Sequence, residues 1–194
     1  MPRRAKIRPD EPGREKVLAA GLELFGERGF HATSIADIGV RAGIAKSVLY
    51  HYFGSKAGLY EVIAETEGRA LLERVAAAVP DDPDAPRLRA GVDAYLSFLV
   101  ERPAAWRLLL RDPPADPELI AVHERLARER AEALAPLLAR ASKGESAPHV
   151  ELMSTAIRAF AAWWYDHREV PRGQVVDAIM DVAAAGARHV APTA

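Results

Sequence analysis

The sequence has no cysteine among its 194 residues. Disulfide bonds, zinc–thiolate sites and a thiol nucleophile are therefore excluded. It also lacks a run of about 18 uncharged apolar residues, so no membrane-spanning helix is expected. The first residues, MPRRAKIRPDEPGREK, lack the apolar stretch of a signal peptide. We therefore expect a cytoplasmic protein.

Recognisable motifs of catalysis are missing too. The six histidines do not form an HExxH pattern, and the chain has neither a phosphate-binding P-loop nor a GxSxG element. We therefore predict that the protein is not an enzyme. No catalytic residue, cofactor or metal ion is predicted.

What the chain does have is helical periodicity. Apolar residues make up 49% and charged residues 27% of a chain long enough to bury a core. Apolar side chains recur at helical spacing throughout, and no segment alternates as a strand does. We predict an all-α fold of about nine helices.

Positive charge is concentrated at the start of the chain. Residues 1–56 contain ten Lys or Arg and six Asp or Glu, whereas the whole chain has a net charge of −1. A basic N-terminal part joined to an acidic remainder fits a phosphate-binding module. A chance fluctuation of solvated charges explains the charge pattern equally well.

The segment GIAKSVLYHYFGSK, residues 43–56, predicts a short helix between two glycine turns. Leu49 and Phe53 are four residues apart and fit a buried face. The opposite face carries a cation, a hydroxyl, a phenol and an imidazole, a combination that suits the groove of duplex DNA. These front residues are Lys46, Ser47, Tyr50 and His51.

Caps and breakers predict the other helix limits. A first helix begins near residues 10–12 and stops at Gly29, and Ser34 with Asp37 resembles the capping box of a second. Ser55 can cap a fourth helix that ends near Val79. A proline-rich break at 80–86 precedes a helix over 88–99, which a short helix over 104–111 follows. A second proline-rich break at 112–117 precedes a helix over 118–141. Pro136 should kink or locally unwind that last helix.

The final two helices carry apolar residues at alternating spacings of three and four, which is typical of closely aligned helices. A second apolar strip of Leu152, Ala156, Ala159 and Trp163 implies cover on two sides. We predict a homodimer with a four-helix interface, and a central core helix is the alternative. The predicted interface residues are Val150, Met153, Ile157, Val175, Ile179, Val182 and Gly186.

Residues 14–63 resemble the signature of the TetR family of transcriptional regulators. The matching elements are LELFGERGF, Thr33-Ser34, Asp37-Ile38, the Ala-Gly pair at 42–43, LYHYF and the Ser-Lys pair at 55–56. The resemblance implies a helix-turn-helix DNA-binding domain over residues 1–56 and a ligand-binding and dimerisation domain over 57–194. Gly39, Ala45 and Val48 depart from the residues frequent in the family, which leaves the operator sequence open.

The resemblance also implies roles for individual residues. Thr33, Ser34, Tyr50 and Lys56 are predicted to hold phosphates, while Lys46, Ser47 and His51 meet base edges. Val48 is predicted to read a thymine methyl group. For each of them, a solvated surface residue is the alternative. The basic arm MPRRAKIR reaches the minor groove or is a disordered tail.

The resemblance further implies a cavity for a small molecule, although aromatic residues at helical spacing also fit a packed core. Few charges fall on the inner faces, which predicts a mostly apolar effector. The predicted function is a repressor that the effector releases from a palindromic operator. The alternative is a helical ligand-binding or scaffolding dimer without DNA-binding activity. The predicted cavity residues are Tyr95, Leu99, Trp106, Leu109, Phe160 and Trp164.

Overall fold

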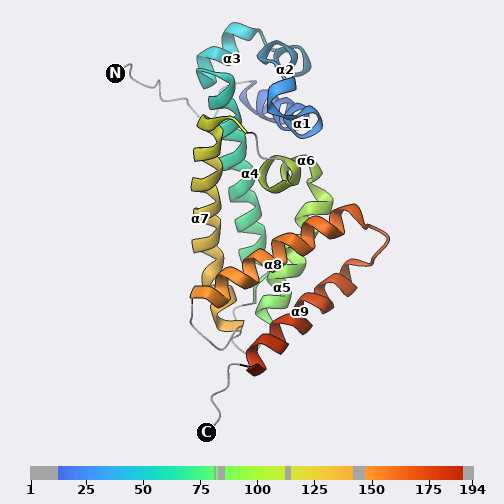
Figure 1. The fold of residues 1–194 in the computed structure, drawn as a ribbon. Helices are drawn as coiled ribbons and strands as arrows, with labels where there is room; N and C mark the ends of the chain where they lie inside the picture. The colour runs from blue at the N-terminus through green and yellow to red at the C-terminus, as the bar shows by residue number, and fades with distance from the viewer. Residues whose placement is uncertain (1–12, 81, 83–85, 112–114, 142–146, 190–194) are drawn as a thin grey trace. The chain divides into compact units, whose positions relative to one another are not determined.

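A computed structural model describes residues 13–80, 82, 86–111, 115–141 and 147–189. All regular elements in these ranges are helical, as predicted (Figure 1). The segment 107–111 is a π-helix, η1, that directly follows α6. No helix in the described ranges is long and apolar enough to cross a membrane. The helices are α1 (Arg14–Ala32), α2 (Ile35–Ala42), α3 (Lys46–Phe53), α4 (Lys56–Ala78), α5 (Arg87–Glu101), α6 (Pro103–Trp106), α7 (Pro117–Ala141), α8 (Ala147–Asp166) and α9 (Arg172–His189).

The chain forms two compact units. The first contains the described residues up to Glu67 together with those of Pro103–Glu124, and the second contains those of Gly68–Arg102 and of 125 onward. Helices α4 and α7 each contribute residues to both units. These units are divisions by compactness and do not test the domain boundary predicted between residues 56 and 57, which stays a prediction.

The first unit is built on α1, which packs against α2, α6 and η1. Glycine allows the close approach of α6, since a Cβ on Gly26 would lie 2.8 Å from Ala104 Cα. Arg107 then donates a hydrogen bond of 2.7 Å from Nε to the Gly26 carbonyl. These contacts join the end of α1 to the α6–η1 segment.

An aromatic cluster that includes Tyr60 of α4 forms part of the core of this unit. The Tyr60 ring meets Phe25 and Phe30 edge-on, with centroids 5.3 and 5.4 Å away. Its hydroxyl lies 3.1 Å from the Leu108 carbonyl and 2.8 Å from His123 Nε2. Burial raises the pKa of Tyr60, so the phenol stays protonated and available as a donor.

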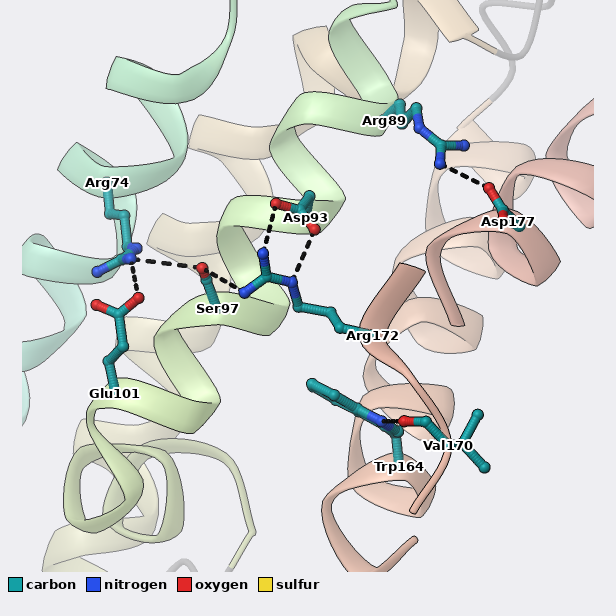
Figure 2. Close-up of polar contacts among 9 residues, drawn as sticks. All are labelled: Arg74, Arg89, Asp93, Ser97, Glu101, Trp164, Val170, Arg172 and Asp177. Atoms are coloured by element: carbon teal, nitrogen blue, oxygen red, sulfur yellow. Dashed lines mark hydrogen bonds and ion pairs between the residues drawn. The ribbon is translucent and has the colours of Figure 1, made fainter. Parts of the chain in front are cut away.

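The second unit packs α5, α8 and α9 against one another. Polar contacts run along α5, where Arg172 of α9 binds Asp93 and the buried Ser97 (Figure 2). Arg74 of α4 contacts the same Ser97 and pairs with Glu101. Because exposed ion pairs add little stability, their main effect is to fix the alignment of the three helices.

The structure differs from the expected limits of α1 at both ends: the helix continues past Gly29, whose φ and ψ are not helical, to Ala32. Helix α1 begins at Arg14 rather than at 10–12, which lie outside the described residues. Of the kink or local unwinding expected at Pro136, the unwinding is absent, because α7 continues through Pro136 to Ala141, and the kink stays a prediction. Pro136 and Glu132, whose carbonyl loses its helical hydrogen bond, are both exposed, so water can satisfy that carbonyl.

Candidate nucleic-acid interface

Helices α2 and α3 form a helix-turn-helix inside the first unit. Gly43 ends α2 with a φ of 68°, a left-handed conformation that glycine adopts without steric cost. Ile44 then donates from its backbone N–H to the Gly39 carbonyl at 2.9 Å. Gly39 also lacks room for a side chain, since its Cβ would lie 2.8 Å from Ile44 O. The turn between the two helices is therefore tight.

The two predicted faces of α3 are confirmed. Leu49 and Phe53 are buried, and the front residues Lys46, Ser47, Tyr50 and His51 are exposed. Val48 is half-buried between the two faces. The Lys46 ammonium lies 5.6 Å from the centroid of the Tyr50 ring, where a cation–π contact is favourable. This front presents a cation and several hydrogen-bonding groups on one exposed surface.

The capping box predicted at the start of α2 is confirmed. The Asp37 N–H donates to Ser34 Oγ at 3.1 Å, and the Ser34 N–H donates to Asp37 Oδ2 at 3.0 Å. Its hydrogen bonds with Ser34 lower the pKa of Asp37. Ser34 is exposed, so the cap leaves its side chain accessible to a phosphate.

Two predicted phosphate ligands have partners inside the protein. The Thr33 side chain is buried, at 1% exposure, and its Oγ1 contacts the Gly29 carbonyl at 2.8 Å and the Leu24 carbonyl at 3.1 Å. Lys56 Nζ donates to Phe30 O at 2.9 Å and to Thr33 O at 3.0 Å. Both side chains bind carbonyls around the end of α1, and their phosphate roles stay predictions.

The end of α1 needs these partners because its backbone is irregular. Gly29, inside α1, has φ 78° and ψ 171°, which interrupts the helical hydrogen bonding. Carbonyls released there require other donors. Sequence reasoning missed this use of Lys56, since its two acceptors are 23 and 26 residues away along the chain.

Other predicted features of the interface have mixed outcomes. Ala45 caps α3 without a side-chain hydrogen bond, as expected from its methyl group. The N-terminal arm MPRRAKIR lies outside the described residues. In the basic N-terminal part, Arg41 is paired with Glu23 at 2.6 Å. Lys46, by contrast, is exposed on the front of α3.

The residues predicted to line a ligand cavity belong to both units. Trp106 and Leu109 are buried in the first unit, and Tyr95, Leu99 and Trp164 are buried in the second. Trp164 donates from Nε1 to the Val170 carbonyl at 2.8 Å, which fixes the turn before α9 (Figure 2). Phe160 is half-buried and lines an apolar groove with α9 residues. The cavity itself stays a prediction.

The predicted interface residues of α8 and α9 differ in exposure. Ile157, Val175 and Ile179 are buried within the second unit, Met153 is half-buried, and Val182 is 61% exposed. The adjoining strip is more accessible, with Leu152 at 69% and Trp163 at 43%. The side chains at Val150 and position 186 lie outside those that the structure describes.

Comparison with known proteins shows that the helix-turn-helix region matches a protein family. Residues 17–63 match the model of "Bacterial regulatory proteins, tetR family". The chain is 28% identical to the HTH-type transcriptional activator FasR of Mycolicibacterium smegmatis, over 97% of this chain and 89% of that protein.

Solved structures share the fold over most of the chain. A TetR-like transcriptional regulator from a Rhodococcus species superposes with a TM-score of 0.74 and 26% identity, covering 92% of this chain and 97% of that one. The regulator FadR from Bacillus subtilis, solved with stearoyl-CoA, has a TM-score of 0.74 at 16% identity. That superposition covers 89% of this chain and 98% of FadR, and it bears on the fold alone.

Proposed function

We propose that the protein binds a palindromic operator as a homodimer, because this chain belongs to the tetR family of bacterial regulatory proteins and is a DNA-binding transcriptional regulator. A small effector would then release the operator. The front of α3 carries this proposal: Lys46, Tyr50 and His51 are exposed above the buried Leu49 and Phe53. Such a helix fits the major groove with its polar side toward the bases.

Operator binding can be tested with duplex DNA from the region upstream of the protein's own gene. We expect a fluorescence anisotropy titration to give tighter binding to one segment than to a shuffled duplex of the same length. Affinity for both duplexes should fall steeply between 50 and 200 mM salt. Equal affinity for the two duplexes, or no binding at low salt, would contradict the proposal.

A specific observation favours a second candidate, a ligand-binding or scaffolding dimer without DNA-binding activity. Ala45 leaves the start of α3 without a side-chain cap, and this typically costs about 1 kcal/mol of helix stability. The exposed polar front of α3 argues against this candidate, because a scaffold has no need of it. The titration above separates the two candidates.

The homodimer is supported by the apolar surface of α8 and α9. Leu152, Trp163 and Val182 are exposed on these helices, and a shallow apolar groove of about 100 Å³ lies between them. Burying this surface in a second subunit would remove it from water. We expect Trp163→Glu and Val182→Glu to convert a dimer to a monomer in sedimentation velocity runs, with Arg69→Glu, at an exposed position on α4, as a surface control outside α8 and α9. A wild-type monomer at micromolar concentration would overturn the dimer.

The sense of regulation is proposed to be repression, as the resemblance to the family implies. FasR of Mycolicibacterium smegmatis is itself named an activator, so the sense needs a test in which the bound promoter drives a reporter gene. We expect deletion of the gene to raise expression from the bound promoter. Lower expression after deletion would identify an activator.

The effector is proposed to have a large apolar part. Five of the six predicted cavity residues are buried and apolar or aromatic. The ligand in the FadR structure, stearoyl-CoA, belongs to that protein, and it is a reasonable first probe for this one. We expect a binding effector to weaken operator affinity through linkage between the two sites. An effector that binds without changing operator affinity would contradict this coupling.

A further inference from the structure

Arg130 is a largely buried cation in the second unit. Its Nη1 is shielded from solvent and has no hydrogen-bond partner in the described part of the chain. Burial lowers the pKa of Arg130. The carboxylate of Glu129 favours the charged guanidinium, but Glu129 is exposed and hydrogen-bonded to Arg125 at 3.2 Å. Burying an unsatisfied charged donor is costly, so its presence calls for a functional explanation.

The close contact of α5 and α7 puts Arg130 beside a buried phenol. A Cβ on Gly91 would lie 2.5 Å from Leu137 Cδ2, so the two helices approach closely there. Tyr95 lies one turn beyond Gly91, and Arg130 lies two turns before Leu137, on the same faces. Each group influences the other: the positive charge of Arg130 favours ionisation of Tyr95, although burial raises the pKa of this phenol overall.

Helix α8 adds a second positive charge to this cluster. Arg158 acts on both Tyr95 and Arg130, and α8 packs against α5. The Arg158 side chain is about half exposed, donates to Thr155 Oγ1 at 3.1 Å and lies 3.8 Å from the exposed Glu151 carboxylate. Three helices therefore bring two guanidinium groups and a phenol together. An anion would compensate this accumulation of positive charge.

The surroundings of the cluster are apolar. Val92 and Leu99 flank Tyr95 on the same side of α5, and Leu126 lies one turn before Arg130 on α7. All three side chains are buried. A ligand that reaches Arg130 would thus need a charged group for the guanidinium and an apolar body for these side chains.

We propose that Arg130, with Tyr95 and Arg158, binds the carboxylate of an effector whose remaining body is apolar. This rests on the proposed function as an effector-controlled regulator, and it replaces the expectation of a mostly apolar ligand by that of an amphiphilic anion. A carboxylate accepts two parallel hydrogen bonds from one guanidinium, and its single negative charge matches the positive charge of Arg130.

The test compares matched acids and amides as probes of the full-length protein. Octanoate and benzoate should raise the Tm of the wild type in a concentration-dependent way, and octanamide and benzamide should bind at least tenfold more weakly. Arg130→Met should abolish the preference for the acid, whereas Arg128→Met, an exposed arginine on the same helix, should keep it. Equal stabilisation by acid and amide, or none by either, would overturn the subsite.

The ligand-free variant gives an independent measurement. Removing an uncompensated buried charge should leave the Tm of Arg130→Met unchanged or raise it by about 2 °C or more. A lower Tm would indicate that Arg130 has an internal structural partner, and it would overturn the proposal. Arg130→Lys keeps the charge without the paired donors, so it should bind octanoate more weakly than the wild type but still prefer it to octanamide.

Operator binding is measured separately in the same preparations. If the wild type binds its operator and ignores both acids, the subsite fails and the DNA-binding function stands. If octanoate binds through Arg130 and no operator is bound, the subsite stands and the proposed function fails. The two proposals therefore have distinguishable outcomes.

Discussion

The Lys56 ammonium contacts both the backbone carbonyl and the aromatic ring of Phe30, near the end of α1. It lies 2.9 Å from the Phe30 carbonyl oxygen and 4.2 Å from the centroid of the same residue's ring. One side chain thus satisfies a released carbonyl and rests on an aromatic face. Lys56 begins α4, so this contact couples the end of the first helix to the start of the fourth.

We expect Lys56→Met to destabilise the protein more than it alters the electrostatics of DNA binding. Losing two hydrogen bonds from a charged donor should cost about 2 kcal/mol and lower the Tm by several degrees. The slope of log affinity against log salt should stay unchanged if Lys56 acts through α1. Thermal unfolding and a salt titration check this, with Lys46→Met as the control for stability. An unchanged Tm with a flatter slope would instead assign Lys56 to a phosphate.

Lys46→Ala should weaken operator binding, because its exposed ammonium stands on the front of α3. A base-edge contact is worth about 1–3 kcal/mol, and its loss should relax the preference at one operator position. A loss that is uniform across sequences, with a salt slope smaller by about 0.9, would reveal a phosphate contact instead. Arg69→Ala, an exposed arginine on α4, provides the control in the same titrations.

The capping box predicts a pH dependence of stability. Hydrogen bonding with Ser34 lowers the pKa of Asp37 below 3.8, so the folded state favours the carboxylate. This contribution is present above the unfolded pKa and is lost as the pH falls through the lowered folded pKa. Asp37→Ala should therefore have a lower Tm than the wild type at pH 7, and the difference should shrink below about pH 4. A constant difference between pH 7 and pH 3 would contradict this.

Gly39→Ala tests the tight turn between α2 and α3. Alanine favours a helix over glycine by about 1 kcal/mol. Its methyl group would meet Ile44 O at 2.8 Å, however, and a backbone shift there should cost about 1–3 kcal/mol. We expect a lower Tm and weaker operator binding. Gly68→Ala in α4, with no heavy atom near its added methyl, should stabilise the protein and serves as the control.

Local patterns carried most of what the sequence predicted. Leu49 and Phe53 were assigned to the core by a spacing of four, and the Ser34–Asp37 cap by a spacing of three, because both depend on one turn of one helix. The acceptors of Lys56 and the burial of Arg130 depend on contacts between helices. Such contacts leave no periodic trace, so the sequence predicted a phosphate contact for Lys56 and did not single out Arg130.

The two glycines around α3 constrain how this protein can evolve. Gly43 and Gly54 have φ angles of 68° and 74°, which a side chain at either position would strain. The exposed residues between them have no such restriction. We therefore expect substitutions of His51 or Ser47 alone to change the proposed operator preference, with the helix kept in place. A combinatorial library over the α3 front should consequently yield many folded variants, whereas one that randomises the two glycines should yield few.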